Sequence, residues 1–229
     1  MTPDRRWLII ETSHRRGEVA VAEGDAVLLR QRLDEARRHA RDLAPTAQSL
    51  LRQLGWSPRD VHGVIVSRGP GSYTGLRVGI MAAKTFAYAT GCTLVAIDTF
   101  AAIAVQAIGS TAWLDVIADA QQDRIYRQRF RRSQSGAWEP AAPLTIQAAA
   151  DWLQALPEGL AVSGPGLEEQ QARLPPGVEV VAAERWLPRA ESLLRLGLAR
   201  FARGEADDPW RLEPLYLRSS DAEEKWAKK

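Results

Sequence analysis

The sequence predicts an α/β protein made of two copies of one unit, in which three strands are followed by helix, strand and helix (βββαβα). Three observations predict it. Short apolar or alternating runs come in threes, at residues 7–33 and again at 113–144. A helical pattern and a buried apolar strand follow each set of three. In both halves that strand runs into one tripeptide, Gly69-Pro70-Gly71 and then Gly164-Pro165-Gly166. We therefore expect a duplicated fold, against the alternative of chance similarity.

The first unit begins with strands at residues 7–12, 18–22 and 27–33, which glycine-containing turns separate. A helix should follow, because apolar residues recur on one helical face up to Gly55: Leu43, Ala47, Leu50, Leu51 and Leu54. The apolar run at 61–66 predicts a strand that is buried on both faces. Next come a helix that Gly91 stops, a strand at 93–97 and a helix that Asp98 can cap.

The second unit repeats this order, with strands at residues 113–118, 124–131 and 138–144. Thr145 is expected to cap a helix with Ile146, Ala149, Leu153 and Leu156 on its inner face. A last amphipathic helix over residues 189–203 ends at Gly204, and the charged tail 221–229 is expected to fray. We expect one domain over 1–108 and another over 109–229, with the last helix in the second domain or packed back on the first.

Composition excludes several classes of protein. A chain of 229 residues with 45% hydrophobic residues can build a core without covalent staples. One cysteine and three histidines exclude an internal disulfide and the usual zinc ligand sets. A net charge of +2 lacks the basic excess of a dedicated nucleic-acid binder. No apolar run approaches the ~20 residues that span a bilayer, and no signal-peptide core is present, so we expect a cytoplasmic protein without membrane contact.

The glycine-rich segment 69–77 joins a strand to a helix, as anion-binding elements do. Gly69, Gly71, Ser72 and Thr74 are the candidate phosphate contacts. The segment lacks both the Walker ending and the G-x-G-x-x-G pattern. The alternative is structural: the glycines permit positive φ and close packing, while Ser72 or Thr74 caps the helix.

Small residues recur every four positions along the next helix, at Gly75, Gly79, Ala83 and Ala87, with Leu76 beside the first. Such a strip lets another element approach closely. It is either the contact for a partner helix or the face that packs on the protein's own sheet.

Two sets of charged residues are further candidates. Four acidic residues stand at strand ends or turns and could hold magnesium or act as acid and base, or be only caps and turn residues: Glu11, Asp98, Asp119 and Asp123. Arg127, Arg129 and Arg131 alternate on one strand, with Arg124 and Arg132 nearby, and would either contact RNA phosphate or guard a solvated sheet edge. The histidines lack the spacing of a metalloprotease.

These segments resemble the TsaB/YeaZ family over nearly the whole chain. Residues 69–79 are similar to its signature GPGSFTGLRIG, with Tyr73 in place of phenylalanine. Residues 8–13 are similar to its opening strand LAIDTS, residues 119–126 to DARRGEVY, and residues 213–218 to EPxYLR. The resemblance implies the duplicated RNase H-like fold of actin, sugar kinases and Hsp70 ATPases. It also makes Glu11, Thr12 and Ser13 candidate nucleotide contacts.

The resemblance implies an accessory subunit that is not itself an enzyme. Members act with a catalytic paralogue, TsaD, and an ATPase, TsaE, to transfer threonylcarbamoyl to the adenosine beside the tRNA anticodon. Gly75, Leu76, Gly79, Ala83 and Ala87 would form the partner interface, or a homodimer contact in the isolated chain. Arg127, Arg129 and Arg131 would contact tRNA. No cofactor of its own is expected, and ATP with magnesium would sit at the interface of the complex.

Several positions depart from the family pattern. Glu11 replaces aspartate, Gln121-Gln122-Asp123 replaces Arg-Arg-Gly, and Arg68 stands where glycine is common. The catalytic paralogue carries two metal-binding histidines on its first helix, and here His39 is followed by Leu43 four residues later. Two other functions stay open. One is an ATP-dependent phosphotransferase that uses Glu11, Asp119 and the 69–74 loop; the other is a glycoprotease-like peptidase of the wider family.

Overall fold

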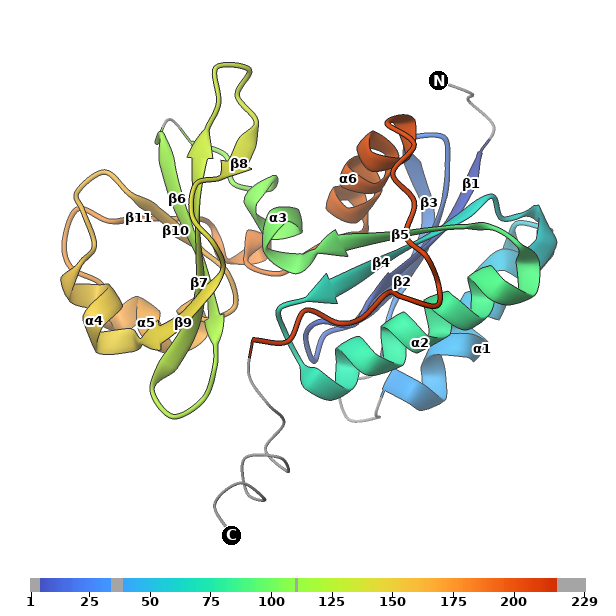
Figure 1. The fold of residues 1–229 in the computed structure, drawn as a ribbon, viewed down its shortest axis with the longest axis horizontal. Helices are drawn as coiled ribbons and strands as arrows, with labels where there is room; N and C mark the ends of the chain where they lie inside the picture. Colours follow the sequence, from blue (N-terminus) through green and yellow to red (C-terminus); the bar gives the residue numbers. More distant parts are fainter. Residues whose placement is uncertain (1–4, 34–38, 110, 218–229) are drawn as a thin grey trace, which may run out of the picture. The chain divides into compact units, whose positions relative to one another are not determined.

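The computed structural model describes residues 5–33, 39–109 and 111–217, and its contacts divide the chain into two units (Figure 1). Unit one combines Met1–Thr99 with Arg189–Lys229, and unit two is Phe100–Pro188. Unit one is thus discontinuous in sequence. The expected division into independently folding domains at residues 108 and 109 stays a prediction.

The sheet of unit one has five strands in the order β3-β2-β1-β4-β5. β1 (Arg6–Glu11), β2 (Glu18–Glu23) and β3 (Ala26–Arg32) form the expected antiparallel meander. β4 (Gly63–Gly69) and β5 (Thr93–Asp98) run parallel to β1. The central strands are apolar throughout because both faces of the sheet are covered.

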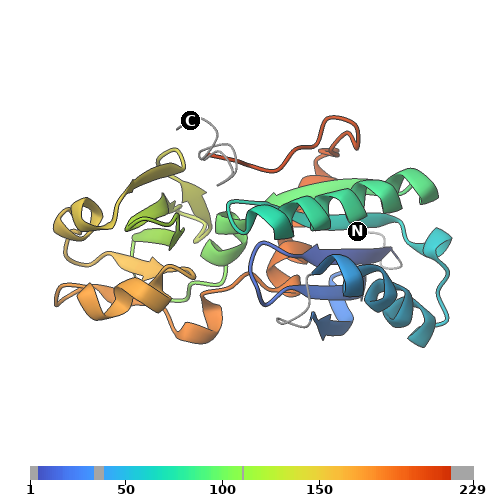
Figure 2. The same cartoon turned by 90° about the horizontal axis from the view of Figure 1, so that it is seen from below.

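Three helices cover the two faces of this sheet (Figure 2). α1 (His39–Gln53) and α2 (Tyr73–Thr90) pack on one face, over a core that includes Leu8, Ile10 and Val64. α6 (Ala190–Ala202) contacts β1, β4 and β5, and Gly197 lets its backbone come close to Ile65. A short 3-10 turn, η1 (Pro58–Asp60), precedes β4.

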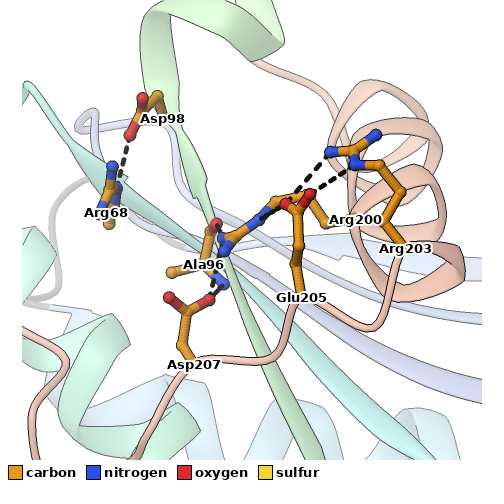
Figure 3. Close-up of polar contacts among 7 residues, drawn as sticks. All are labelled: Arg68, Ala96, Asp98, Arg200, Arg203, Glu205 and Asp207. Atoms are coloured by element: carbon orange, nitrogen blue, oxygen red, sulfur yellow. Dashed lines mark hydrogen bonds and ion pairs between the residues drawn. The ribbon is translucent and has the colours of Figure 1, made fainter.

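The segment after α6 covers the open edge of β5 (Figure 3). The Asp207 amide donates to the Leu94 carbonyl (2.8 Å), and the Asp207 carboxylate accepts from the Ala96 amide (2.7 Å). Arg200 donates to the Ala96 carbonyl and to Asp207 (2.9 Å). Polar groups of β5 that would otherwise face solvent are therefore capped by the segment that follows α6.

Unit two repeats the same sheet order, β11-β10-β6-β7-β8, with an additional strand β9 on β7. Its strands are β6 (Trp113–Asp119), β7 (Arg124–Arg132), β8 (Trp138–Pro140), β9 (Thr145–Ala148), β10 (Ala161–Ser163) and β11 (Glu179–Val180). The helical elements are α3 (Thr99–Ala104), which spans the division between the units, and α4 (Ala149–Gln154), α5 (Leu167–Gln170), η2 (Gln171–Arg173) and η3 (Ala183–Arg185). Because β6, β7, β8, β10 and β11 take the places of β1 to β5, the structure confirms the duplicated RNase H-like fold.

Two predictions about unit two are wrong. The expected strand at 138–144 ends at Pro140, and Thr145 lies in β9 instead of capping a helix. The Thr145 hydroxyl donates to the Arg127 carbonyl across the β7–β9 pair (3.3 Å), so the sheet uses it. α4 starts after Ala148 without a side-chain cap and buries Ala149 and Trp152. The tail 221–229 lies outside the described residues, and none of the described helices is long and apolar enough to cross a membrane.

Candidate functional site

The junction between β1 and the start of α2 is the candidate site that the glycine-rich segment predicts. Gly69 has φ 115° and Gly71 has φ 159°, and the Ser72 hydroxyl accepts from the Gly75 amide (3.2 Å). Ser72 is therefore the helix cap, as the structural alternative expects. Gly91 ends the helix with φ 74°.

Backbone fills the space in front of this helix. The Ser72 amide donates to the Ser13 carbonyl (2.7 Å). A Cβ atom at Gly71 would lie 2.3 Å from the Ser13 carbonyl oxygen, and one at Gly75 would lie 2.1 Å from that of Thr12. These glycines thus serve close packing of α2 on the end of β1. The Ser72 and Gly75 amides, which an anion would need, already have partners within the chain.

The end of β1 is buried at all three candidate nucleotide contacts, since Glu11, Thr12 and Ser13 are at most 4% exposed. The Ser13 amide and hydroxyl both donate to one Glu11 carboxylate oxygen, the amide at 2.6 Å. Within the described part of the chain, the other carboxylate oxygen has no partner. Burial, opposed by the hydrogen bonds from Ser13, raises the pKa of Glu11 to about 7.

The other acidic candidates each have a local partner. Asp98 pairs with Arg68 (Figure 3), and Asp119 accepts from the Gln121 amide (2.7 Å). Asp123 pairs with Arg173 (2.9 Å). No group of three or more His, Cys, Asp and Glu side chains able to hold a metal ion occurs among the described residues. Asp119 is a turn residue as the alternative expects, whereas Asp98 and Asp123 contact arginine side chains.

The strip of small residues packs on the protein's own sheet. Gly75, Leu76, Gly79, Ala83 and Ala87 are all buried. A Cβ atom at Gly79 would lie 2.0 Å from the Thr12 hydroxyl oxygen. The expectation that these five residues meet a partner helix is therefore corrected to the alternative. The small side chains are needed because α2 lies so close to β1.

The exposed face of α2 carries large apolar side chains that the spacing argument missed. Met81 is 59% exposed and Tyr88 is 72% exposed. Trp210, from the segment after α6, is 76% exposed and meets Tyr88 edge-on at 5.4 Å between ring centroids. That segment follows α2 (Figure 2), because Lys84 donates to the Leu212 carbonyl (3.0 Å) and Tyr216 stacks on Tyr73. We call Met81, Tyr88 and Trp210 the α2 surface.

The arginines of β7 do not form a row of unpaired cations. Arg127 and Arg129 each make two hydrogen bonds, of 2.8 to 3.2 Å, to the carboxylate of Asp115. Asp115 is fully buried and also accepts from the indole of Trp152 (3.1 Å). β7 pairs with strands on both sides, so the expectation of a solvated sheet edge is wrong. Of the three predicted tRNA contacts, Arg131 has an exposed side chain.

Comparisons with known proteins fit this architecture. A family profile described as TsaD, tRNA N6-adenosine threonylcarbamoyltransferase, matches residues 33–179. The tRNA threonylcarbamoyladenosine biosynthesis protein TsaB of Bacillus subtilis is 28% identical over 96% of each chain. The chain belongs to the TsaB/YeaZ family. The Escherichia coli TsaB is 28% identical over 81% of this chain and 83% of its own. The solved structure of YeaZ from Pseudomonas aeruginosa is similar with TM-score 0.75 and 25% identity, covering 93% of this chain and all of that one.

Proposed function

We propose that this chain is an accessory subunit for the formation of threonylcarbamoyladenosine in tRNA. It would pair with a TsaD-type catalytic subunit and a TsaE-type ATPase in the cytoplasm, and tRNA would be bound through the complex. The relatives named TsaB support this role. The match to the TsaD profile over residues 33–179 supports descent from a common ancestor with the catalytic subunit.

The observation that carries the accessory role is the filled junction between β1 and α2. The residues there do not fit a nucleotide phosphate, because the Thr12 and Ser13 carbonyls contact Gly75 and Gly71 where a phosphate would have to lie. Glu11 faces Ser13 inside the protein and is 2% exposed, so it is poorly placed to hold magnesium. An ATP-dependent phosphotransferase that uses these residues is therefore disfavoured.

The partner contact that fits this role is the α2 surface. Its three side chains are more than half exposed although they are large and apolar, and clusters of this kind mark association sites. Residues buried beneath them hold α2 in place and leave this face free. The same face would account for self-association of the isolated chain.

Reconstitution tests the role. The purified chain is mixed with TsaD-type and TsaE-type subunits of one organism, tRNA, ATP, threonine and bicarbonate, with the enzyme that forms threonylcarbamoyl-adenylate. We expect modified tRNA to form with the chain present and to be lost when it is omitted. Met81→Glu should abolish both pairing and modification, whereas Arg195→Glu, on an exposed position of α6, should leave both unchanged. Full modification without the chain would overturn the proposal, as would ATP or peptide hydrolysis by the chain alone that Glu11→Ala removes.

A further inference from the structure

The hairpin between β7 and β8 forms a polar pocket that the accessory role does not use. Its volume is about 580 Å³, and its walls are the consecutive residues Arg131, Arg132, Ser133, Gln134 and Ser135. The hydroxyls of Ser133 and Ser135 lie 2.9 Å apart. No carboxylate contributes to the walls, so the pocket combines two cationic side chains with neutral hydrogen-bonding groups.

The positive charge of this pocket is not neutralised within the described residues. Asp115 is engaged by Arg127 and Arg129, and neither Arg131 nor Arg132 makes an ion pair in the described part of the chain. Glu139 lies opposite Arg131 in the β7–β8 register without pairing with it. Because successive residues of a strand face opposite sides of the sheet, an anion on either face of the hairpin would meet one uncompensated guanidinium group.

Arg132 is prepared for such an anion. Its guanidinium carbon lies 4.4 Å from the centre of the Trp138 ring, and the Trp138 indole donates to the Ala107 carbonyl (3.3 Å). Its Nε and Nη2 atoms are shielded from solvent and have no acceptor among the described residues. Because this cation has already lost part of its hydration, it gains more from a nearby anion than an exposed arginine does.

The chemistry of the hairpin favours RNA over other polyanions. Guanidinium groups match the oxygen geometry of phosphate, and Trp113, which lies opposite Arg131 in the β6–β7 register, is 43% exposed and offers a ring on which a base can stack. The pocket walls have no apolar side chain that could enter a lipid layer.

We propose that the β7–β8 hairpin binds RNA through two backbone phosphates, one at Arg131 and one at Arg132 on the opposite face of the strand, with Trp113 beside Arg131 as a stacking surface for a neighbouring base. Naming that RNA as tRNA rests on the proposed function. The binding itself rests on the hairpin alone.

Titration of fluorescent tRNA with the full chain, and with the chain in complex with its partners, tests the proposal. The double variant Arg131→Gln with Arg132→Gln should raise the tRNA Kd about tenfold. It should also reduce the steepness of the slope of log K against log salt concentration by about one to two. Glu139→Gln should lower the Kd, because it removes a repelling carboxylate. Arg59→Gln with Arg195→Gln removes the same charge from exposed positions of unit one and should change the Kd little.

Arg131→Gln alone covers the case in which loss of the Arg132–Trp138 contact unfolds the hairpin, and circular dichroism reports folding. Unchanged tRNA affinity in a folded Arg131→Gln variant would overturn the proposal. Binding to phosphatidylserine-containing vesicles, lost in the double variant while tRNA binding is kept, would also overturn it. Reconstitution separates the two proposals: if the chain is still required for modification while hairpin variants bind tRNA normally, only the hairpin assignment is wrong.

Discussion

Substitution of alanine at the two glycines that face Thr12 should have unequal effects. At Gly75 the new methyl group would lie 2.1 Å from the Thr12 carbonyl oxygen, which is backbone directly after β1 and cannot rotate away as a side chain can. At Gly79 it would lie 2.0 Å from the Thr12 hydroxyl oxygen, which can move by a change of side-chain rotamer. That hydroxyl has no hydrogen-bond partner among the described residues, so moving it breaks none of the described bonds.

The magnitudes follow from two opposing effects. Overpacking costs about 1–3 kcal/mol, and replacing glycine within a helix returns at most about 1 kcal/mol. We expect Gly79→Ala to lose at most about 2 kcal/mol, whereas Gly75→Ala should lose about 3 kcal/mol or more because backbone must shift. In a chain of this size, 1 kcal/mol corresponds to about 2–4 °C in Tm.

Denaturant unfolding monitored by circular dichroism measures both variants. Combining Gly79→Ala with Thr12→Ala should recover stability relative to the sum of the single changes, because the new methyl group then occupies the space left by the hydroxyl. Equal losses at the two glycines, or no coupling between Thr12 and Gly79, would refute the close packing of α2 on β1.

Three further changes test other parts of the structure. Ala83→Leu should lower the free energy of unfolding by about 1–3 kcal/mol because Ala83 is fully buried, whereas exposed Met81→Leu should have little effect; a fully stable Ala83→Leu monomer would contradict burial. Burial raises the pKa of Glu11 from 4.5 to about 7, so the folded state holds its proton more tightly and stability falls as pH rises between those values. Relative to Glu11→Gln, the unchanged chain should lose about 3 kcal/mol between about pH 4 and pH 8, and urea melts with parallel profiles would show that Glu11 does not titrate there. Asp115→Ala should cost about 3 kcal/mol because it leaves two guanidinium groups without their buried partner. Asp123→Ala, at the exposed pair with Arg173, should cost less than about 1 kcal/mol. Similar losses by calorimetry would contradict a stabilising role for the buried ion pairs of Asp115 with Arg127 and Arg129.

Local patterns were sufficient to predict most strands and the main helix ends. The repeat of strand order and of Gly-Pro-Gly predicts the duplication that both sheets confirm. Ser72 and Gly91 act locally, as a hydroxyl cap and a left-handed stop, and therefore follow from residue type. The place of Thr145 does not follow from residue type, because threonine is favoured both as a helix cap and on a paired strand.

The candidate site depended on contacts that spacing alone does not encode. Small residues every four positions fit a partner helix and the protein's own sheet equally well, and only the proximity of Thr12 decides between them. The ion pairs of Asp115 could have been predicted from the sequence. Antiparallel pairing around the turn after Asp119 brings Asp115 opposite Arg129, and an aspartate inside an apolar strand signals a buried charge in need of a partner.

The discontinuity of unit one has a consequence for synthesis on the ribosome. Trp7 and Ile65 face α6, in which Phe201 meets the Trp7 ring and Gly197 meets Ile65. Unit two, residues Phe100–Pro188, is translated between the first sheet and that helix. At roughly 5–20 residues per second, the half-covered sheet waits roughly 5 to 20 seconds for its second layer. During this interval unit two is a continuous segment that can fold first. The apolar face of the unfinished unit one meanwhile needs chaperones, or other proteins, to shield it.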